Sequence, residues 1–233
     1  MQVWSWSGFF QYLVSPYLLV GALTTLWLTA AALLFGLALG VALALMRLSR
    51  TPWLERCAWF YTWLFRGTPL LVQLVVIYTG LPQLGIRFGV VTCALLGLGL
   101  NEGAYFAEII RAGILAVPKG QYEAATALGL RYRTTMRLVV LPQAARIIIP
   151  PVGNSVNGLL KTTSLTSVIS MEELLRRSQE LIQVNFQVLE IFTVAALYYL
   201  LMTTLWDLVQ RRLERRFGRG FAAGGASQAQ DRS

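Results

Sequence analysis

Two short stretches of this largely apolar sequence carry polar side chains at helical spacing. In the first, "NEGAYFAEIIR", Asn101, Tyr105 and Glu108 share one face of a helix, with Glu102 and Arg111 on its flanks. An acidic side chain at bilayer depth costs about 2.5–3.5 kcal/mol, so an unpartnered glutamate facing lipid is not expected. The stretch indicates either a structural ion pair, for example Glu108 with Arg111, or a polar wall that accepts an ammonium group. We favour the wall for Asn101 and Glu102, and Glu108 fits either interpretation.

The second stretch is "NSVNGLLKTTSL", later in the chain. Asn154, Asn157 and Lys161 recur at helical spacing, and we expect them on one face of a helix. Thr163 and Ser164 follow where that helix is predicted to end. A lysine ammonium, two hydroxyls and backbone groups freed at a helix end together suit a carboxylate, as in the broken helices of transporters.

Taken together, the two stretches predict a site for an amino acid zwitterion within the membrane. The carboxylate end would approach Lys161 and the two hydroxyls, and the amino or side-chain end would approach Asn101 and Glu102. The alternative is that Lys161 only neutralises Glu102 or Glu108, with no ligand between them. The two interpretations are compatible, because a zwitterion could insert between the two charges.

The composition excludes several kinds of chemistry. The 233 residues contain no histidine and only two cysteines, Cys57 and Cys93, which are most simply packing residues. This excludes most zinc sites and every catalytic triad that needs an imidazole. The sequence also has no GxxxxGK[ST] phosphate-binding loop, so any ATP hydrolysis must come from another chain. We predict no metal, no cofactor and no catalytic residue.

The elements that would position these residues are membrane helices. Hydrophobic residues make up 56% of the chain and charged residues 13%, against about 25% charged in soluble domains. Residues 17–46 form an apolar run longer than the roughly 20 residues that span a bilayer. No cleavable signal peptide is visible. The net charge of +9 comes from basic residues gathered at 47–66, 111–146 and 211–219, which predicts cytoplasmic flanks and requires no nucleic acid partner.

We therefore predict an all-α integral membrane protein with five transmembrane helices, its N-terminus outside and its C-terminus cytoplasmic. The spans lie at about 20–46, within 59–81, at 90–117, from about 147, and at 188–208. One transmembrane domain would cover 1–219, and 220–233 would be a disordered tail. The segment "MEELLRRSQELIQVNFQ" would lie outside.

Prolines interrupt two of these spans. Arg66–Pro69 would mark where an interfacial helix gives way to a short second span, which is a structural role. Gln73 lies one turn further in and is a weaker candidate to face the predicted polar site. In the fourth span, Pro150 and Pro151 predict a late start or a bend.

One polar stretch is too regular for a slack connection. In residues 118–142, "QYEAATAL" forms two turns of helix, and Gly129 stands where a left-handed residue would end them. "RYRTTMRLVV" restarts a helix, which Leu141-Pro142 would stop. The pattern predicts a helix–turn–helix elbow on the cytoplasmic face. The alternative is a solvated connecting loop.

These segments resemble a known family. "EAATALGL" followed by "VVLPQA" is similar to the EAA motif of ABC importer permeases, and "FRGTPLLVQL", "NEGAYFAEIIRAGI" and "PPVGNSVNGLLKTTSLTSVIS" resemble segments of the polar amino acid permease subfamily. The subfamily commonly has an aspartate where this chain has Thr162. By this resemblance, the residues that contact an ATPase would be Tyr122, Glu123, Ala124, Ala125, Leu128, Gly129, Arg131 and Pro142.

The resemblance also implies an architecture and partners. It implies the fold of type I ABC importer permeases, in a bacterial cytoplasmic (inner) membrane. The permease would pair with a second permease, which is either a copy or a relative, and would work with a dimer of ABC ATPases. An extracytoplasmic binding protein would deliver the amino acid, with the outer amphipathic segment as its candidate docking site.

Two other classes of function remain to be weighed against this one. An ion channel or a proton-coupled carrier could use Glu102, Glu108 and Lys161 directly. An integral membrane enzyme acting on lipid would need a nucleophile, a base or a metal cluster near the interface, and the sequence supplies neither histidine nor a carboxylate cluster there.

Overall fold

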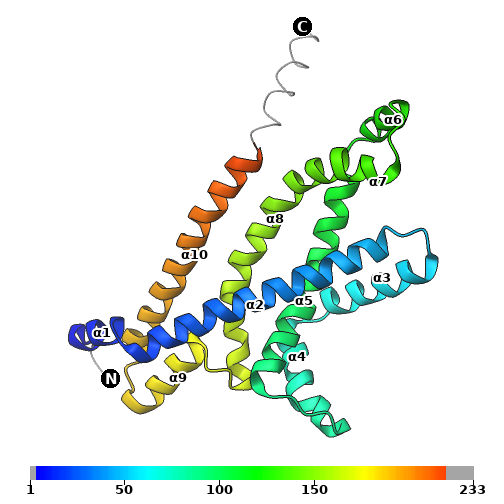
Figure 1. Ribbon diagram of the computed structural model, residues 1–233. Coiled ribbons are helices and arrows are strands. Elements are labelled where there is room, and N and C mark those ends of the chain that lie inside the picture. Colours follow the sequence, from blue (N-terminus) through cyan, green and yellow to red (C-terminus); the bar gives the residue numbers. More distant parts are fainter. Residues whose placement is uncertain (1–3, 219–233) are drawn as a thin grey trace.

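The computed structural model describes residues 4–218, and the predicted disordered tail at 220–233 lies outside them. Within this range the chain is helical and contains no β-strand (Figure 1). Three helices are long and apolar enough to cross a membrane: α2 (Pro16–Arg47), α5 (Val90–Leu115) and α10 (Val188–Gly218). A fourth span results if α3 (Pro52–Gly67) is joined to Leu70–Leu84, which is bent from it by 103°.

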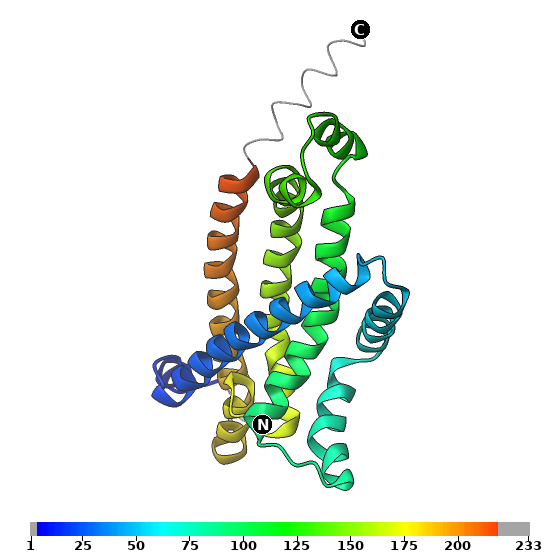
Figure 2. The same cartoon turned by 45° about the vertical axis from the view of Figure 1, so that its right-hand side comes forward.

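The predicted fourth span corresponds to α8 (Leu141–Thr162), which packs between α5 and α10 (Figure 2). It is not among the helices that qualify as spans by length and composition. Its sequence includes Arg146, Lys161 and three prolines, which lower its mean hydropathy. The count of five spans therefore stays a prediction, although α8 runs alongside α5 and α10, two of the three helices that do qualify.

Helices α2 and α5 make the most extensive helix pair of the fold. Gly40 lies in α2 against α5, where a Cβ atom would come within 2.5 Å of Phe106 Cβ and 3.1 Å of the Ala107 backbone nitrogen. Gly36 lies one turn earlier, and Gly99 and Gly103 repeat the same spacing on α5. Small residues four apart let two membrane helices approach closely, and this explains how the tilted α2 can cross α5 in contact (Figure 1).

Two π-helical turns precede the two Leu-Pro-Gln segments of the chain. The turn η1 (Val76–Gly80) comes before Leu81-Pro82, and η3 (Met136–Val140) comes before Leu141-Pro142. The prediction that Leu141-Pro142 stops the second helix of the elbow is wrong: α7 (Tyr132–Thr135), η3 and α8 follow without a gap. Proline lacks an N–H, and a wider turn just before it lets the helix continue without that hydrogen bond.

The same continuity places the start of the helix earlier than the predicted start of the fourth span. The helix is already under way at Leu141 and passes through Pro150 and Pro151, whereas the span was expected from about 147.

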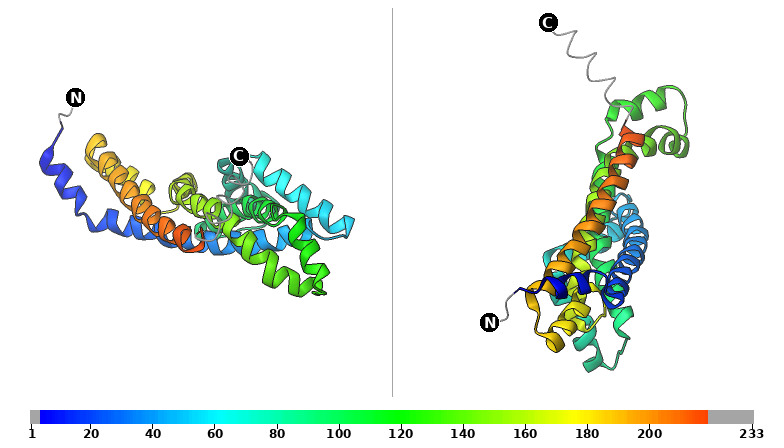
Figure 3. Two further views of the ribbon diagram at one scale, coloured as in Figure 1. Left: turned by 90° about the horizontal axis from the view of Figure 1, so that it is seen from above. Right: turned by 90° about the vertical axis from the view of Figure 1, so that its left-hand side faces the viewer.

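The polar segments lie at the two ends of the molecule. Helix α6 (Lys119–Ala127) and α7 lie together at one end, and α1 (Trp6–Leu13) and α9 (Leu174–Asn185) lie at the other (Figures 1 and 3). The short helix η2 (Leu81–Leu84) follows η1 at the end of the bent second span, and η4 (Thr163–Ile169) joins α8 to the α9 segment. The chain therefore has one end built around the elbow and one built around two short amphipathic helices.

Candidate functional site

A cavity of about 630 Å³ lies where the break between α3 and α4 (Leu70–Val75) faces α5 and α8. We call it the central cavity. Four helices, α3, α4, α5 and α8, contribute to its wall, so the bend between α3 and α4 is what opens it. Its lining residues are Arg66, Gly67, Thr68, Pro69, Leu70, Asn101, Glu102, Tyr105, Asn154, Ser155, Gly158 and Thr162.

The break is held open by two amide side chains. The Phe65 carbonyl, freed where α3 ends, accepts hydrogen bonds from Gln73 Nε2 at 2.9 Å and from Asn101 Nδ2 at 3.1 Å. Asn101 Nδ2 also donates to Gln73 Oε1 at 3.1 Å, and Gln73 Nε2 donates to the Thr68 carbonyl at 3.1 Å. Backbone groups at membrane depth need such partners. Asn101 and Gln73 thus have a clear structural role in shaping the cavity.

Arg66 and Glu102 bring opposite charges to the central cavity. The Arg66 guanidinium lies over the Tyr105 ring, 5.4 Å from its centroid, where the negative face of the ring attracts the cation. No Lys or Arg nitrogen of residues 4–218 lies within 4.0 Å of the Glu102 carboxylate. Thr162 lines the same wall and donates to the Gly158 carbonyl at 2.8 Å. Among the described lining residues, Glu102 is the one carboxylate and Arg66 the one cation.

Three residues predicted beside Asn154 do not reach this cavity. Asn157 Nδ2 donates to Asp207 Oδ1 of α10 at 2.6 Å, and Lys161 and Ser164 line a separate cavity against α10. Asn157 is about 60° around the helix from Asn154, so these residues do lie on one side of α8. They do not share one cavity, because α5 and α10 pack on either side of α8 and divide that side between them.

Thr163 does not take part in either cavity. It is fully buried and donates to the Leu160 carbonyl at 2.8 Å, so its hydroxyl is satisfied within the chain.

Glu108 lies outside the central cavity and is paired. Its carboxylate is 3.4 Å from an Arg47 guanidinium nitrogen and 3.8 Å from one of Arg111. The pair with Arg111 agrees with the structural interpretation of Glu108. The shorter contact is with Arg47, the last residue of α2. This pair was not predicted from the sequence, where its only sign is that Arg47 follows a long apolar run.

The elbow is confirmed as a helix closed by a left-handed glycine. Gly129 has φ +74°, and its N–H donates to the Thr126 carbonyl at 2.9 Å while the Leu130 N–H donates to Ala125 at 3.1 Å. These two bonds satisfy carbonyls at the end of α6. Tyr122 is half-buried and packs on the inner cluster that includes Val117 and Ala144, which holds α6 against the bundle.

The outer face of the elbow carries large apolar side chains that nothing in the described chain covers. Leu128 is 79% exposed and Tyr132 is 74% exposed, at the end of the molecule beyond the apolar helices (Figure 1). Ala125 is buried against the bundle. The other predicted coupling residues are exposed: Glu123, Ala124, Gly129, Arg131 and Pro142.

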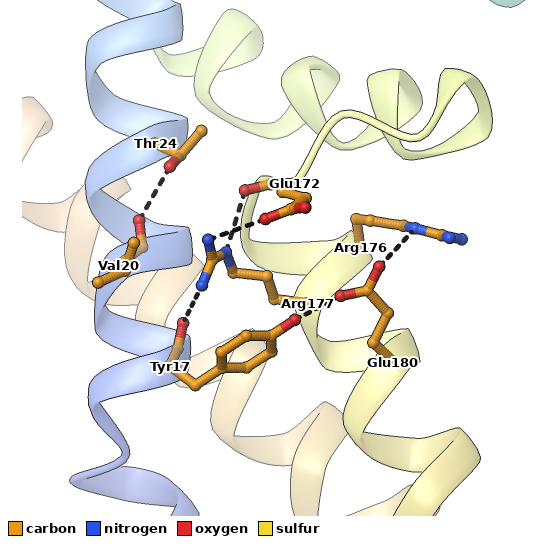
Figure 4. Close-up of polar contacts among 7 residues, drawn as sticks. All are labelled: Tyr17, Val20, Thr24, Glu172, Arg176, Arg177 and Glu180. Atoms are coloured by element: carbon orange, nitrogen blue, oxygen red, sulfur yellow. Dashed lines mark hydrogen bonds and ion pairs between the residues drawn. The ribbon is translucent and has the colours of Figure 1, made fainter. Parts of the chain in front are cut away.

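The opposite end of the molecule is fixed by charged groups on α9. Arg177 lies over the Tyr17 ring of α2, 4.5 Å from its centroid, and pairs with Glu172 at 3.0 Å (Figure 4). Arg176 pairs with Glu180 at 3.0 Å, and the Tyr17 hydroxyl donates to Glu180 (Figure 4). These contacts attach α9 to the start of α2.

A buried carboxylate starts α9. Glu173 is fully buried and accepts hydrogen bonds from the Leu175 and Arg176 N–H groups at 2.9 and 2.8 Å and from the Tyr199 hydroxyl at 2.8 Å. Burial raises the pKa of the Glu173 carboxyl, and the three donors oppose this rise only in part. Glu173 thus connects α9 with α10.

Comparison with known proteins gives consistent relatives. The chain is 41% identical over 233 residues to the arginine transport system permease protein ArgU of Corynebacterium glutamicum, covering 94% of this chain and 74% of that one. It is 40% identical over 203 residues to the glutamine transport system permease protein GlnP of Escherichia coli K12, covering 86% and 93%. It is 42% identical to the L-cystine transport system permease protein TcyB of Bacillus subtilis, covering 88% of each.

Solved structures agree with the fold. A chain from the crystal structure of an amino acid ABC transporter with histidines superposes with a TM-score of 0.87 at 37% identity, covering 92% of this chain and all of that one. The MetNI methionine ABC transporter in an inward-facing conformation gives a TM-score of 0.73 at 21% identity, which shows the fold alone. Residues 32–219 match the family described as the binding-protein-dependent transport system inner membrane component. The chain therefore belongs to this family of multi-pass transport permeases of the inner membrane, as the resemblance of its motifs predicted.

Proposed function

We propose that this chain is the permease subunit of an ATP-driven importer for polar amino acids. It would pair with a second permease, a copy or a relative, and bind a dimer of ABC ATPases. An extracytoplasmic binding protein would supply the amino acid. The relatives named for arginine, glutamine and cystine transport support the substrate class. The permease domain would cover residues 1–219, with five spans, the N-terminus outside and the C-terminus in the cytoplasm.

The observation that carries the proposal is the uncovered apolar tip of the elbow. Leu128 and Tyr132 are exposed on a polar, helical projection at the end of the molecule, where lipid does not cover them if that end is cytoplasmic. Basic residues around the elbow and after α10 support the cytoplasmic orientation. An apolar side chain surrounded by polar residues on such a projection suits a protein partner. We assign this surface to the ATPase.

A pair of substitutions tests the assignment. Leu128→Glu places a charge on the elbow. Leu84→Glu makes the same change far from the elbow, at a leucine of η2 that is 77% exposed. The chain would be co-expressed with its ATPase and purified by a tag on the permease. We expect Leu128→Glu to lose most of the bound ATPase and Leu84→Glu to keep it. Equal recovery of ATPase with both variants would contradict the assignment.

For the substrate path we propose the central cavity, with Arg66 in the role that the sequence suggested for Lys161. One cation and one carboxylate line the cavity, and this suits a zwitterion. The substrate carboxylate would approach Arg66, whose planar guanidinium binds carboxylates in a bidentate manner. The ammonium group would approach Glu102 and the Tyr105 ring. Asn154 and Thr162 complete the polar wall from α8.

Kinetics separate this site from the one first expected. Arg66→Gln and Glu102→Gln should each raise the apparent KM for amino acid uptake by about tenfold or more, the loss typical of a charged hydrogen bond. Lys161→Gln should leave KM within about twofold, because Lys161 lies in the separate cavity against α10. A KM that changes with Lys161→Gln and not with Arg66→Gln would restore the first assignment and refute this one.

A further inference from the structure

A second charged cavity lies beside the central cavity, at the corner between the end of α2, α3 and α5. It has a volume of about 460 Å³ and shares Arg66 and Gly67 with the central cavity. We call it the corner pocket. Substrate entry does not explain it, because its other lining residues do not belong to the central cavity. These residues are Arg47, Trp59, Thr62, Trp63 and Glu108.

The corner pocket has more positive than negative charge. Among the described residues that line it, Arg47 and Arg66 are the cations and Glu108 is the one carboxylate, 3.4 Å from Arg47. Glu108 is also 3.8 Å from Arg111, which does not line the pocket but takes part of its negative charge. The Arg47 side chain is only 11% exposed, and its Nε has no hydrogen-bond partner among residues 4–218. A buried guanidinium donor without a partner is costly, so this corner suits an additional anion.

The rim of the corner pocket is aromatic. Trp59 and Trp63 lie on successive turns of α3 with nearly parallel rings, 6.2 Å between centroids, and both are more than half exposed. Trp53 and Phe60 are also exposed on α3. Exposed tryptophans on an amphipathic helix are typical of the headgroup level of a bilayer. The charged floor and the aromatic rim therefore lie side by side where lipid headgroups are found.

We propose that the corner pocket binds the phosphate group of an anionic phospholipid. Arg47 and Arg66 would donate to the phosphate oxygens, and Trp59 and Trp63 would pack along the glycerol and upper acyl chains. Basic pockets between membrane helices on the cytoplasmic side bind anionic lipid headgroups in this manner. Free inorganic phosphate has the same charged group but no acyl chain to cover the two rings, and we favour the lipid for this reason.

The two tryptophans allow a direct measurement. The purified chain is placed in vesicles of phosphatidylcholine with increasing amounts of phosphatidylglycerol, one of the two lipids carrying brominated acyl chains that quench tryptophan fluorescence. The quenching that is seen in the unaltered chain and is lost in the Trp59→Phe/Trp63→Phe variant reports on lipid at the corner pocket. Symmetric vesicles make the result independent of membrane orientation, and the measurement involves no transport, so it can fail without refuting the proposed function.

We expect phosphatidylglycerol to be preferred at this position, and Arg47→Gln to lower the preference by about tenfold. Arg50→Gln is the matched control, because Arg50 is exposed three residues further on and does not line the pocket. It should keep the preference. Should Arg47→Gln fail to fold, Arg66→Gln tests the other side of the same pocket.

Three results would overturn the proposal. One is the absence of any preference for the anionic lipid in the unaltered chain. Another is an equal loss of preference in Arg47→Gln and Arg50→Gln, which would indicate general surface charge. The third is a preference abolished by millimolar inorganic phosphate at constant ionic strength, which would identify a site for a small anion in place of a lipid.

Discussion

The left-handed glycine of the elbow gives a prediction whose size follows from the structure. Gly129 has φ +74°, and a Cβ atom added there would meet nothing within 4 Å. Gly129→Ala therefore introduces no steric clash with the rest of the chain, and only the backbone conformation is penalised. A non-glycine residue in the left-handed region costs about 1–2 kcal/mol. We expect this cost to fall on the hairpin of α6 and α7 and not on the packed bundle.

Gly120 supplies the matched control. It lies in the first turn of α6, a Cβ atom there also meets nothing within 4 Å, and its φ is not positive. Alanine in place of glycine in a helix stabilises it by up to about 1 kcal/mol. The same chemical change, seven positions before α6 ends at Ala127, should therefore have the opposite effect on the stability of the helix.

Amide hydrogen exchange measures both effects. Since about 1.4 kcal/mol is a factor of ten, Gly129→Ala should speed exchange of the α6 amides by roughly 5- to 30-fold, and Gly120→Ala should slow it by up to about fivefold. Gly129→Asn should fall between alanine and glycine, because asparagine tolerates this conformation. Affinity for the ATPase should decrease from glycine to asparagine to alanine at position 129. Equal exchange rates in the two alanine variants would show that Gly129 does not hold the elbow.

Two further predictions concern the bundle and its buried acid. Gly40→Ala places a Cβ 2.5 Å from Phe106 Cβ, so α2 and α5 must separate, and we expect a loss of about 1–3 kcal/mol, seen as a lower Tm in detergent. Gly67→Ala, where a Cβ meets nothing within 4 Å, should leave Tm almost unchanged, and a similar Tm for the two variants would contradict the packing. Burial raises the pKa of Glu173, so the stability tied to its protonated form is complete below its unfolded pKa and is lost as pH rises through the folded pKa. The Tm of the unaltered chain should thus rise relative to Glu173→Gln as pH falls from neutral to about 5, and a constant difference would refute the burial effect.

The sequence predicted best where one local rule decided the structure. Gly129 ends α6 in the left-handed conformation because glycine has no Cβ, and this was visible from its place after an alanine-rich helix. The apolar run that became α2 was equally clear from its length. The elbow's second helix was mispredicted at Pro142, because the π-helical turn that accommodates the proline has no signal in the sequence.

Prediction of the site was limited by how the helices pack around it. Helical spacing placed Asn154 and Asn157 within one quadrant of α8, but only the positions of α5 and α10 decide which neighbour each side chain meets. Arg66 was interpreted as a structural residue at a turn. It lines the central cavity because the chain bends by 103° between α3 and Leu70–Leu84, and its contact with Tyr105 of α5 joins segments 39 positions apart in the chain. Such long-range contacts cannot be obtained from periodicity.

The most direct test of the account is the energy source for uptake. The chain is reconstituted in vesicles alone, or together with its ATPase and binding protein, and uptake of labelled arginine, glutamine and cystine is measured with ATP or with a proton gradient. We predict uptake of at least one of them only in the complete assembly and only with ATP, and loss of that uptake with Leu128→Glu. Uptake by the chain alone, driven by the proton gradient, would contradict the central claim and identify a proton-coupled carrier.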